Sequence, residues 1–229
     1  PQNPKTPQIL RNNKTMEPPT VVIDNGTGYT KMGYAGNIEP NYIIPSKIAT
    51  PTNKVSALKS LTTVQKNGKF DIADLDYYIG DMADSKAKTH NVNWILRSGQ
   101  VEDWEGIEKY WHKSIYQYLR CEPEEHRFIL TEPPMNSPEN REQMAEIMFE
   151  TFGVKGLFIG VQATLALYSQ VARGGSSLAN FGASDLTGLV VDSGDGVTHV
   201  FPVSSGFVIS SCIKHIPLAG RDITKFVME

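Results

Sequence analysis

Val21–Lys31 reads VVIDNGTGYTK, and Leu189–His199 repeats the same pattern as LVVDSGDGVTH. Each stretch begins with an apolar, β-branched run that predicts a buried strand, and each run ends in an aspartate, Asp24 or Asp192. A Gly-x-Gly pair then predicts a turn into a second strand. Glycine allows positive φ, and without a Cβ its backbone N–H group can approach a phosphate oxygen. Both stretches therefore predict a hairpin suited to phosphate, with an aspartate that can hold a hydrated cation.

The repetition is more informative than either copy, because a single Asp-x-Gly-x-Gly more often makes an ordinary hairpin. When the glycines are superposed, Lys31 falls where His199 falls, and Thr30 falls where Thr198 falls. Two similar half-molecules that face each other across a nucleotide would give this pattern. Neither stretch has the Gly-Lys-Ser/Thr of a P-loop or the Gly-x-Gly-x-x-Gly of a dinucleotide fold.

The composition sets bounds without identifying a function. At 229 residues, 40% hydrophobic and 21% charged, the chain is long enough for one large or two modest globular domains. A formal net charge of −3 gives no electrostatic reason to expect nucleic acid as a partner. No apolar run approaches the ~18 residues of a transmembrane helix, so we expect no membrane span. With Cys121 and Cys212 as its two cysteines, the chain predicts no disulfide framework and favours a reducing compartment.

Glycine, proline and polar residues divide the chain into segments. Residues 1–20 carry five prolines without hydrophobic periodicity and predict a mobile tail, residues 46–94 form a more polar excursion, and residues 174–177 predict a loose segment. Strands are predicted within 21–44 and at 128–131, 157–161, 186–192, 197–203 and 206–213, and helices at 104–119, from Ser137 to Gly153, from Gln162 and after Thr224. This order of strands, helices and strands predicts an α/β architecture.

Apolar residues at three- and four-residue spacing predict that the helix at 104–119 buries one face. These residues are Ile107, Tyr110, Trp111, Ile115, Tyr118 and Leu119. Ser137 followed by Pro138 predicts the start of the next helix, because serine caps free N–H groups and proline suits the first turn. Gly153 predicts the end of that helix.

At the two hairpins the chain resembles the actin superfamily, whose two domains each present such a hairpin to ATP and magnesium. Other segments resemble an actin-related member of this family more than conventional actin. They are Asp74–Asp81, Val101–Trp104, Tyr118–His126, Leu130–Arg141 and Ile213–Thr224. The resemblance runs from about Val21 to Glu229, with gaps at residues 50–72 and 172–185.

This resemblance implies an α/β actin-like ATPase fold of the ribonuclease H-like type, with two related domains facing a nucleotide cleft. Residues 21–45 and 95–169 would form the core of the first domain, and residues 46–94 would form a small outer subdomain inserted in it. Residues 170–229 would begin the second domain. Since the sequence stops a few residues into the helix after Thr224, we expect that second domain to be incomplete here.

The resemblance also implies the cofactors, ATP and Mg²⁺. Asp24 and Asp192 would hold magnesium through its water shell, and Gln162 would orient the water that attacks the γ-phosphate. The local sequence alone instead favours Gln162 as a helix-start residue with local hydrogen bonds. His199 is either a partly buried structural imidazole or a group near that water. The residues expected to contact the nucleotide are Asn25, Gly26, Thr27, Gly28, Tyr29, Lys31, Gly194, Asp195, Gly196, Val197 and Gly220.

One segment departs from the family pattern. Where the family usually has Pro-Ile-Arg-His-Gly, residues 95–99 read ILRSG. Ser98 therefore replaces a histidine that lies near the nucleotide sensor loop of actins, and a serine cannot titrate as that histidine does.

The implied function is structural and regulatory: an ATP-binding subunit of a multi-protein assembly that hydrolyses ATP slowly at most. The expected assembly is the complex that nucleates branched actin filaments, so its partners would be other subunits, a second actin-related protein and actin filaments. The expected location is the cytoplasm and cytoskeleton, with a cilium or other cell projection as an alternative. A non-nucleating subunit of a ciliary or chromatin assembly also stays open. An actin-fold kinase or chaperone ATPase is disfavoured, because a kinase needs a catalytic aspartate where this chain has Gln162.

Overall fold

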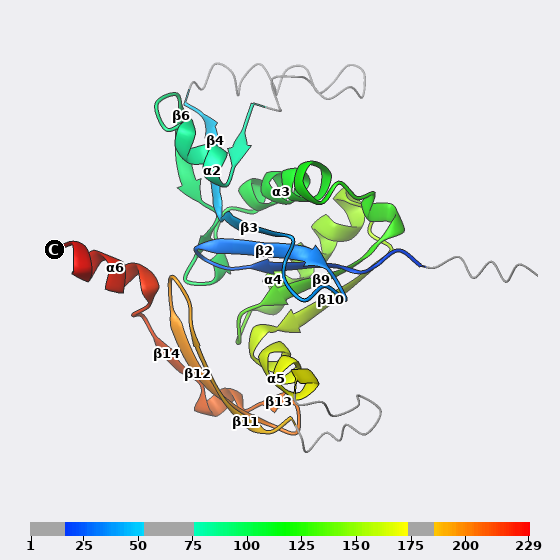
Figure 1. The fold of residues 1–229 in the computed structure, drawn as a ribbon, viewed down its shortest axis with the longest axis vertical. Coiled ribbons are helices and arrows are strands. Elements are labelled where there is room, and N and C mark those ends of the chain that lie inside the picture. The colour runs from blue at the N-terminus through cyan, green and yellow to red at the C-terminus, as the bar shows by residue number, and fades with distance from the viewer. Residues whose placement is uncertain (1–16, 53–75, 174–185) are drawn as a thin grey trace, which may run out of the picture.

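A mixed five-stranded sheet forms the centre of the molecule. The computed structural model describes residues 17–52, 76–173 and 186–229. The strand order is β10-β9-β1-β2-β3, in which β1, β2 and β3 form an antiparallel meander, while β9 runs parallel to β1 and to β10 (Figure 1). The strands are β1 (Val21–Asn25), β2 (Tyr29–Tyr34), β3 (Tyr42–Pro45), β9 (Arg127–Glu132) and β10 (Gly156–Val161). The predicted strands at 21–44, 128–131 and 157–161 are confirmed.

Two helical segments cover one face of this sheet. α3 (Trp104–Lys113) continues into a π-helical turn (Ser114–Leu119), and α4 (Pro138–Glu146) continues into a second one (Ile147–Thr151). Ser137 caps α4 by accepting a hydrogen bond from the backbone N–H of Asn140, as its position before a proline predicted. Gly153 follows with a φ of 62°, a conformation that favours glycine and ends the segment.

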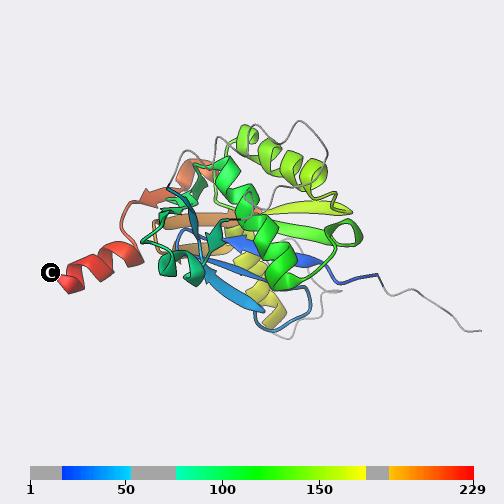
Figure 2. The same ribbon diagram turned by 90° about the horizontal axis from the view of Figure 1, so that it is seen from above.

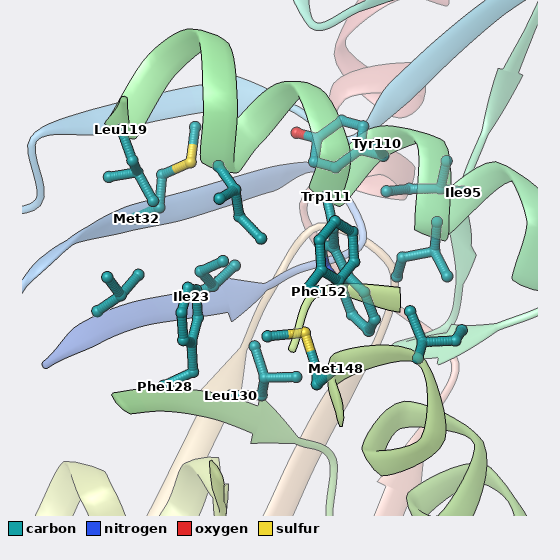
Figure 3. Packing of buried hydrophobic residues seen from close by; sticks show 14 of the residues in the cluster. Ile23, Met32, Ile95, Tyr110, Trp111, Leu119, Phe128, Leu130, Met148 and Phe152 are labelled. Atoms are coloured by element: carbon teal, nitrogen blue, oxygen red, sulfur yellow. The ribbon is translucent and has the colours of Figure 1, made fainter. Parts of the chain in front are cut away.

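The main hydrophobic core lies between these helices and the sheet (Figure 3). Trp111 and Tyr110 of α3 pack there with Ile23 of β1 and Phe128 of β9, and all four are buried. The predicted apolar face of residues 104–119 is confirmed, with Tyr118 packed at its margin. In β1 buried and partly exposed residues alternate, so Ile23 faces this core and Asp24 faces the opposite side of the sheet. The side chain of Asp24 therefore does not take part in the core and is available on the opposite face of the sheet.

The described part of the polar excursion forms a smaller sheet beside β3. Its strand order is β5-β4-β6, with a short helix beside it. The elements are β4 (Lys47–Pro51), β5 (Tyr78–Ile79), α2 (Asp81–Ser85) and β6 (His90–Trp94). A tight hairpin of β7 (Leu96–Arg97) and β8 (Gln100–Val101) then leads back toward α3, and a 3-10 turn (Pro123–Glu125) precedes β9. Residues 53–75 lie outside the described part of the chain.

α5 (Gln162–Arg173) leads from the central sheet to another sheet that contains the second hairpin (Figures 1 and 2). Gln162 begins this helix, as predicted. β12 lies between β11 and two short strands, β13 and β14, and α6 follows. These elements are β11 (Gly188–Ser193), β12 (Thr198–Ser204), β13 (Phe207–Val208), β14 (Lys214–Ile216) and α6 (Gly220–Met228). The predicted loose segment at 174–177 lies outside the described residues.

Two predictions about strands were wrong in detail. The single strand predicted at 206–213 is instead β13 followed by a 3-10 turn (Ser210–Cys212), where the serines break the apolar run. The apolar run of the second hairpin does form a strand, but it is not buried, since Leu189 is 65% exposed and Val191 is 61% exposed. Phe158 in β10 is exposed in the same way. An apolar run predicts a strand, but it does not reveal which of its faces another element covers.

The predicted tail at residues 1–20 is described only from Glu17 onward. Glu17 forms ion pairs with Arg127 and Lys155, and the backbone oxygen of Pro19 lies 2.8 Å from Nδ1 of His126. Residues 17–20 are therefore attached to the end of the central sheet at which β9 and β10 begin, and residues 1–16 lie outside the described chain. In the described ranges, no helix combines the length and apolar character that crossing a membrane requires.

Candidate functional site

The two predicted hairpins face each other across a pocket of about 470 Å³. In the first hairpin Asp24 pairs with Lys31, and in the second Asp192 pairs with His199. The equivalence inferred from the repeated sequence is therefore confirmed at the level of strand register. Because cross-strand partners lie on the same face of a sheet, each hairpin presents one carboxylate and one basic side chain together. All four residues line the pocket.

Asp24 is the centre of a polar cluster on the first side of the pocket. Its Oδ2 accepts a hydrogen bond from Nζ of Lys31 at 2.9 Å. Its Oδ1 accepts one from Oγ1 of Thr131 at 2.5 Å and another from Nε2 of Gln162 at 3.1 Å. Three donors fix the orientation of this carboxylate. Such a group is suited to bind the water shell of a cation, since its Oδ2 keeps a further lone pair.

The turns of the two hairpins touch each other in a reciprocal manner. A Cβ added to Gly28 would lie 2.8 Å from Cβ of Asp195, and one added to Gly196 would lie 2.7 Å from Cγ2 of Thr27. In each turn, a glycine thus lies against a side chain of the other turn. Gly26 is constrained within its own hairpin, because its Cβ would lie 2.6 Å from the backbone oxygen of Tyr29. Glycine is required at these positions by close approach of the backbone.

Three hydrogen bonds, one buried and two partly buried, hold the first turn in place. Trp111 in α3 donates from Nε1 to Oδ1 of Asn25 at 3.1 Å, and Oγ of Ser46 donates to the backbone oxygen of Gly26 at 2.7 Å. Thr27 accepts a hydrogen bond from the backbone N–H of Gly99 at 2.8 Å. The turn is therefore fixed from three elements distant in sequence. A binding loop held in this way is preorganised, so a ligand does not have to order it.

The second side of the pocket carries a histidine pair. Nε2 of His199 lies 3.0 Å from Nδ1 of His215, and His199 is 7% exposed. Burial, reinforced by the neighbouring imidazole of His215, holds the pKa of His199 below its usual value, although the carboxylate of Asp192 acts in the opposite direction. His199 is therefore neutral at neutral pH. It can donate or accept a hydrogen bond in the pocket without adding positive charge.

Acidification from pH 7.5 to 5.5 should lower the free energy of unfolding of the full-length protein. The pKa of His199 is lower in the folded state than its usual value of about 6.5, so the unfolded chain binds more protons once the pH falls below that value. His199→Gln should remove part of this loss of stability. The remaining loss should persist, because burial also lowers the pKa of His112. Urea unfolding of both proteins at both pH values measures the difference. An identical pH dependence in His199→Gln would contradict this assignment.

The pocket brings together nearly all of the residues predicted from the sequence. Those that line it are Asp24, Asn25, Gly26, Thr27, Gly28, Tyr29, Lys31, Gln162, Asp192, Gly194, Asp195, Gly196, Val197 and His199. Gly220 is not among the lining residues. Its backbone N–H donates to the backbone oxygen of Gly194 at 2.9 Å, so it supports the second turn from the start of α6.

Sequence reasoning missed two polar contributions to the pocket, Thr131 and the backbone of Gly99. Thr131 follows Leu130, which pairs with Ile23 in the parallel register of β9 and β1, so Thr131 comes beside Asp24. That register is a property of the assembled sheet, so no signal near Thr131 in the sequence could have located it. Gly99, with a φ of 81°, lies in the β7–β8 turn next to Ser98, which replaces the usual histidine of the family.

The side chains of the pocket suit a metal ion that is bound through its water molecules and not enclosed by protein ligands. Within residues 17–52, 76–173 and 186–229 there is no cluster of three or more histidine, cysteine, aspartate or glutamate side chains that could enclose a metal directly. Asp24 and Asp192 instead contribute one carboxylate from each hairpin. Mg²⁺ commonly keeps several waters and binds through one or two carboxylates together with substrate phosphates. The pair of aspartates matches that mode.

Comparison with known proteins identifies the family. Residues 15–229 match the profile of the family described as Actin. Proteins described as actin-related protein 3 are 54% identical in Dictyostelium discoideum, 56% in Acanthamoeba castellanii and 57% in Caenorhabditis elegans. Each alignment covers 92% of this chain and 48–49% of the relative, so the chain spans about half the length of the curated relatives it matches. These matches confirm the resemblance and the actin fold expected from the two hairpins: the chain belongs to the actin family.

Proposed function

We propose that the chain supplies one side and part of the other side of an ATP-binding cleft in an actin-related structural subunit. The observation that carries this proposal is the pair of hairpins, which face each other with glycine turns in contact and with one carboxylate and one basic group each. A nucleotide triphosphate carries several negative charges and a bound cation. Backbone N–H groups at glycine turns, Lys31 and the two aspartates are the groups that such a ligand needs.

Each part of the pocket has a distinct role in this proposal. The turns at Gly26–Tyr29 and Gly194–Val197 hold the phosphates from opposite sides, Lys31 neutralises phosphate charge, and Asp24 with Asp192 holds magnesium through water. When bound, Mg²⁺ supplies electrostatic stabilisation of the phosphate oxygens. The nucleotide then links the two hairpins, so its presence favours the closed arrangement of the cleft. The main consequence of binding is conformational, and hydrolysis is slow.

We also propose the domain arrangement that the family resemblance implies. Residues 21–45 and 95–169 act as one domain, residues 46–94 as its outer subdomain, and residues 170–229 as the beginning of a second domain. The separate five-stranded, three-stranded and four-stranded sheets support this division. The pocket at the junction between the first and last of them is where a nucleotide would join the two domains.

The assembly proposed for this subunit is the complex that nucleates branched actin filaments, in the cytoplasm and cytoskeleton. The support is the identity of 54–57% to proteins described as actin-related protein 3. Its partners would then be the other subunits, a second actin-related protein and actin filaments. Affinity purification of the full-length protein, followed by identification of the copurifying subunits, tests this directly. Recovery of a chromatin or ciliary assembly without actin-nucleating activity would overturn it.

Gln162→Ala should slow ATP hydrolysis by at least ~10-fold, while changing ATP affinity by no more than about twofold. Nε2 of Gln162 is committed to Asp24 and Thr131, which leaves its Oε1 as the acceptor for a water in the pocket. The substitution removes this acceptor but retains both hairpins. The measurement is single-turnover phosphate release by the assembled protein with ATP already bound.

Asp192→Ala is the contrasting variant, because it should reduce magnesium-dependent affinity and hydrolysis together. Phosphate release at the unchanged rate in Gln162→Ala would show that this residue is only a helix-start group with local hydrogen bonds. The proposal for nucleotide binding would survive that result, whereas loss of ATP affinity in Gln162→Ala would place the residue in the binding step.

A further inference from the structure

Arg221 in the first turn of α6 contacts both the second hairpin and the three-stranded sheet of the polar excursion. Its Nη2 donates to Oδ2 of Asp195 at 2.6 Å, and its backbone N–H donates to the backbone oxygen of the same residue at 2.9 Å. Its guanidinium also lies over the ring of Trp94, with Cζ 4.2 Å from the ring centroid. Trp94 ends β6 in the three-stranded sheet. Arg221 therefore joins the turn of the second hairpin to the sheet formed by the polar excursion.

This contact crosses between parts of the fold that are distant in the sequence. Figure 1 shows α6 and the sheet of β4 and β6 on the same side of the molecule, with α6 projecting from the sheet that contains β12. Asp195 is also the residue against which Gly28 packs. A continuous chain of contacts thus runs from the first turn through Asp195 and Arg221 to Trp94.

The physical nature of the contact suits a reversible closure. A planar guanidinium over an indole face is stabilised by cation–π attraction, which contributes about 0.5–1 kcal/mol at exposed sites. Trp94 is 41% exposed and the Arg221 side chain is 33% exposed, so the pair lies at the surface and can separate without burying an unpaired charge. The ion pair with Asp195 keeps the guanidinium oriented even when Trp94 moves away.

We propose that Arg221 is a positioning residue that holds the outer sheet against the second hairpin and thereby slows dissociation of the nucleotide. This inference rests on the proposed function, since it concerns the same cleft. Opening the cleft has to separate Arg221 from Trp94, because the two side chains belong to opposite sides. The stacking energy therefore adds to the barrier for release. The Arg221–Trp94 contact does not touch the phosphates, so the association rate of a nucleotide with the open cleft should not change.

The test measures association and dissociation of a fluorescent ATP analogue with the full-length protein. Trp94→Leu removes the aromatic face but keeps the Arg221–Asp195 ion pair, and it should accelerate dissociation about fivefold with the association rate unchanged. Trp94→Phe restores an aromatic face and should recover most of the slow dissociation. Arg221→Gln should accelerate dissociation further, because it also loses the contact with Asp195. In the Trp94→Leu background, the additional effect of Arg221→Gln should be smaller than in the unchanged protein.

Lys47 provides a matched control. Its Nζ lies 4.7 Å from the centroid of the same Trp94 ring, but Lys47 and Trp94 are cross-strand partners within one sheet. Lys47→Gln therefore removes a cation from the ring without removing a contact across the cleft, and it should leave nucleotide dissociation unchanged. Urea unfolding of each variant verifies that the fold is retained.

The outcomes separate the two proposals. If the unchanged protein binds ATP but Trp94→Leu dissociates at the same rate, Arg221 does not act through Trp94 and this inference is wrong while the proposed function stands. Equal acceleration by Lys47→Gln and Trp94→Leu would also overturn it, because the effect would then come from the outer sheet alone. If the unchanged protein binds no ATP, the proposed function fails and the inference fails with it.

Discussion

Gly194→Val should weaken binding of Mg·ATP to the full-length protein by about 30-fold, which corresponds to about 2 kcal/mol. Among the described residues, and apart from its two chain neighbours, a Cβ at Gly194 would have its nearest contact at the backbone oxygen of Val197, 3.6 Å away. The turn therefore has room for a Cβ, and the main effect of the substitution is to keep phosphate away from the backbone N–H groups of the turn. Fluorescence titration with ATP measures the affinity.

Gly26→Val should weaken ATP binding by a similar factor, but for a second reason as well. Its Cβ would lie 2.6 Å from the backbone oxygen of Tyr29, so the first turn has to distort and the protein should also become less stable. Gly156→Val is the matched control, because its nearest contact, Cγ of Arg127 at 3.5 Å, resembles that of Gly194 and lies outside the pocket lining. Unchanged affinity in Gly194→Val would remove the main support for the phosphate clamp.

Trp111→Ala should lower the free energy of unfolding by about 4 kcal/mol. Trp111 is completely buried between α3 and the central sheet, and no smaller side chain fills that volume (Figure 3). The substitution also leaves the buried amide of Asn25 without its indole donor. Urea unfolding of the full-length protein measures the loss.

Trp111→Phe separates the two contributions, because it keeps most of the aromatic volume and removes only the hydrogen bond to Asn25. It should cost about 1–2 kcal/mol in stability and should also weaken ATP binding, since Asn25 belongs to the first turn. Phe158→Ala is the control: this aromatic side chain is 57% exposed, so its removal should cost less than about 1 kcal/mol. A similar loss in Phe158→Ala and Trp111→Ala would contradict the assignment of the core.

The two hairpins and the equivalence of Lys31 with His199 were predictable because the signals for them are local. Each hairpin is marked by an apolar run and a Gly-x-Gly turn that are adjacent in the sequence, and the structure then places Lys31 opposite Asp24 and His199 opposite Asp192. The start of α4 at Ser137 and Pro138 was predictable for the same reason, since a helix cap is a property of adjacent residues.

The features that sequence reasoning missed depend on distant parts of the chain. Thr131 reaches Asp24 only because β9 and β1 pair in one particular parallel register, and nothing near Thr131 in the sequence encodes that register. The exposure of Leu189 and Val191 likewise depends on what covers their side of β11. Arg221 and Trp94 are separated by more than half of the chain, so their contact follows from the assembled fold.

The reciprocal packing of the two turns has an evolutionary consequence. Gly28 fits against Asp195, and Gly196 fits against Thr27, so each turn sets the size of the side chain that the other can carry. A mutation to a larger residue in one turn would be tolerated only after a reduction in the other. Positions 27 and 196, and positions 28 and 195, should therefore change in pairs when descendants of this chain diverge, although the two members of each pair lie far apart in the gene.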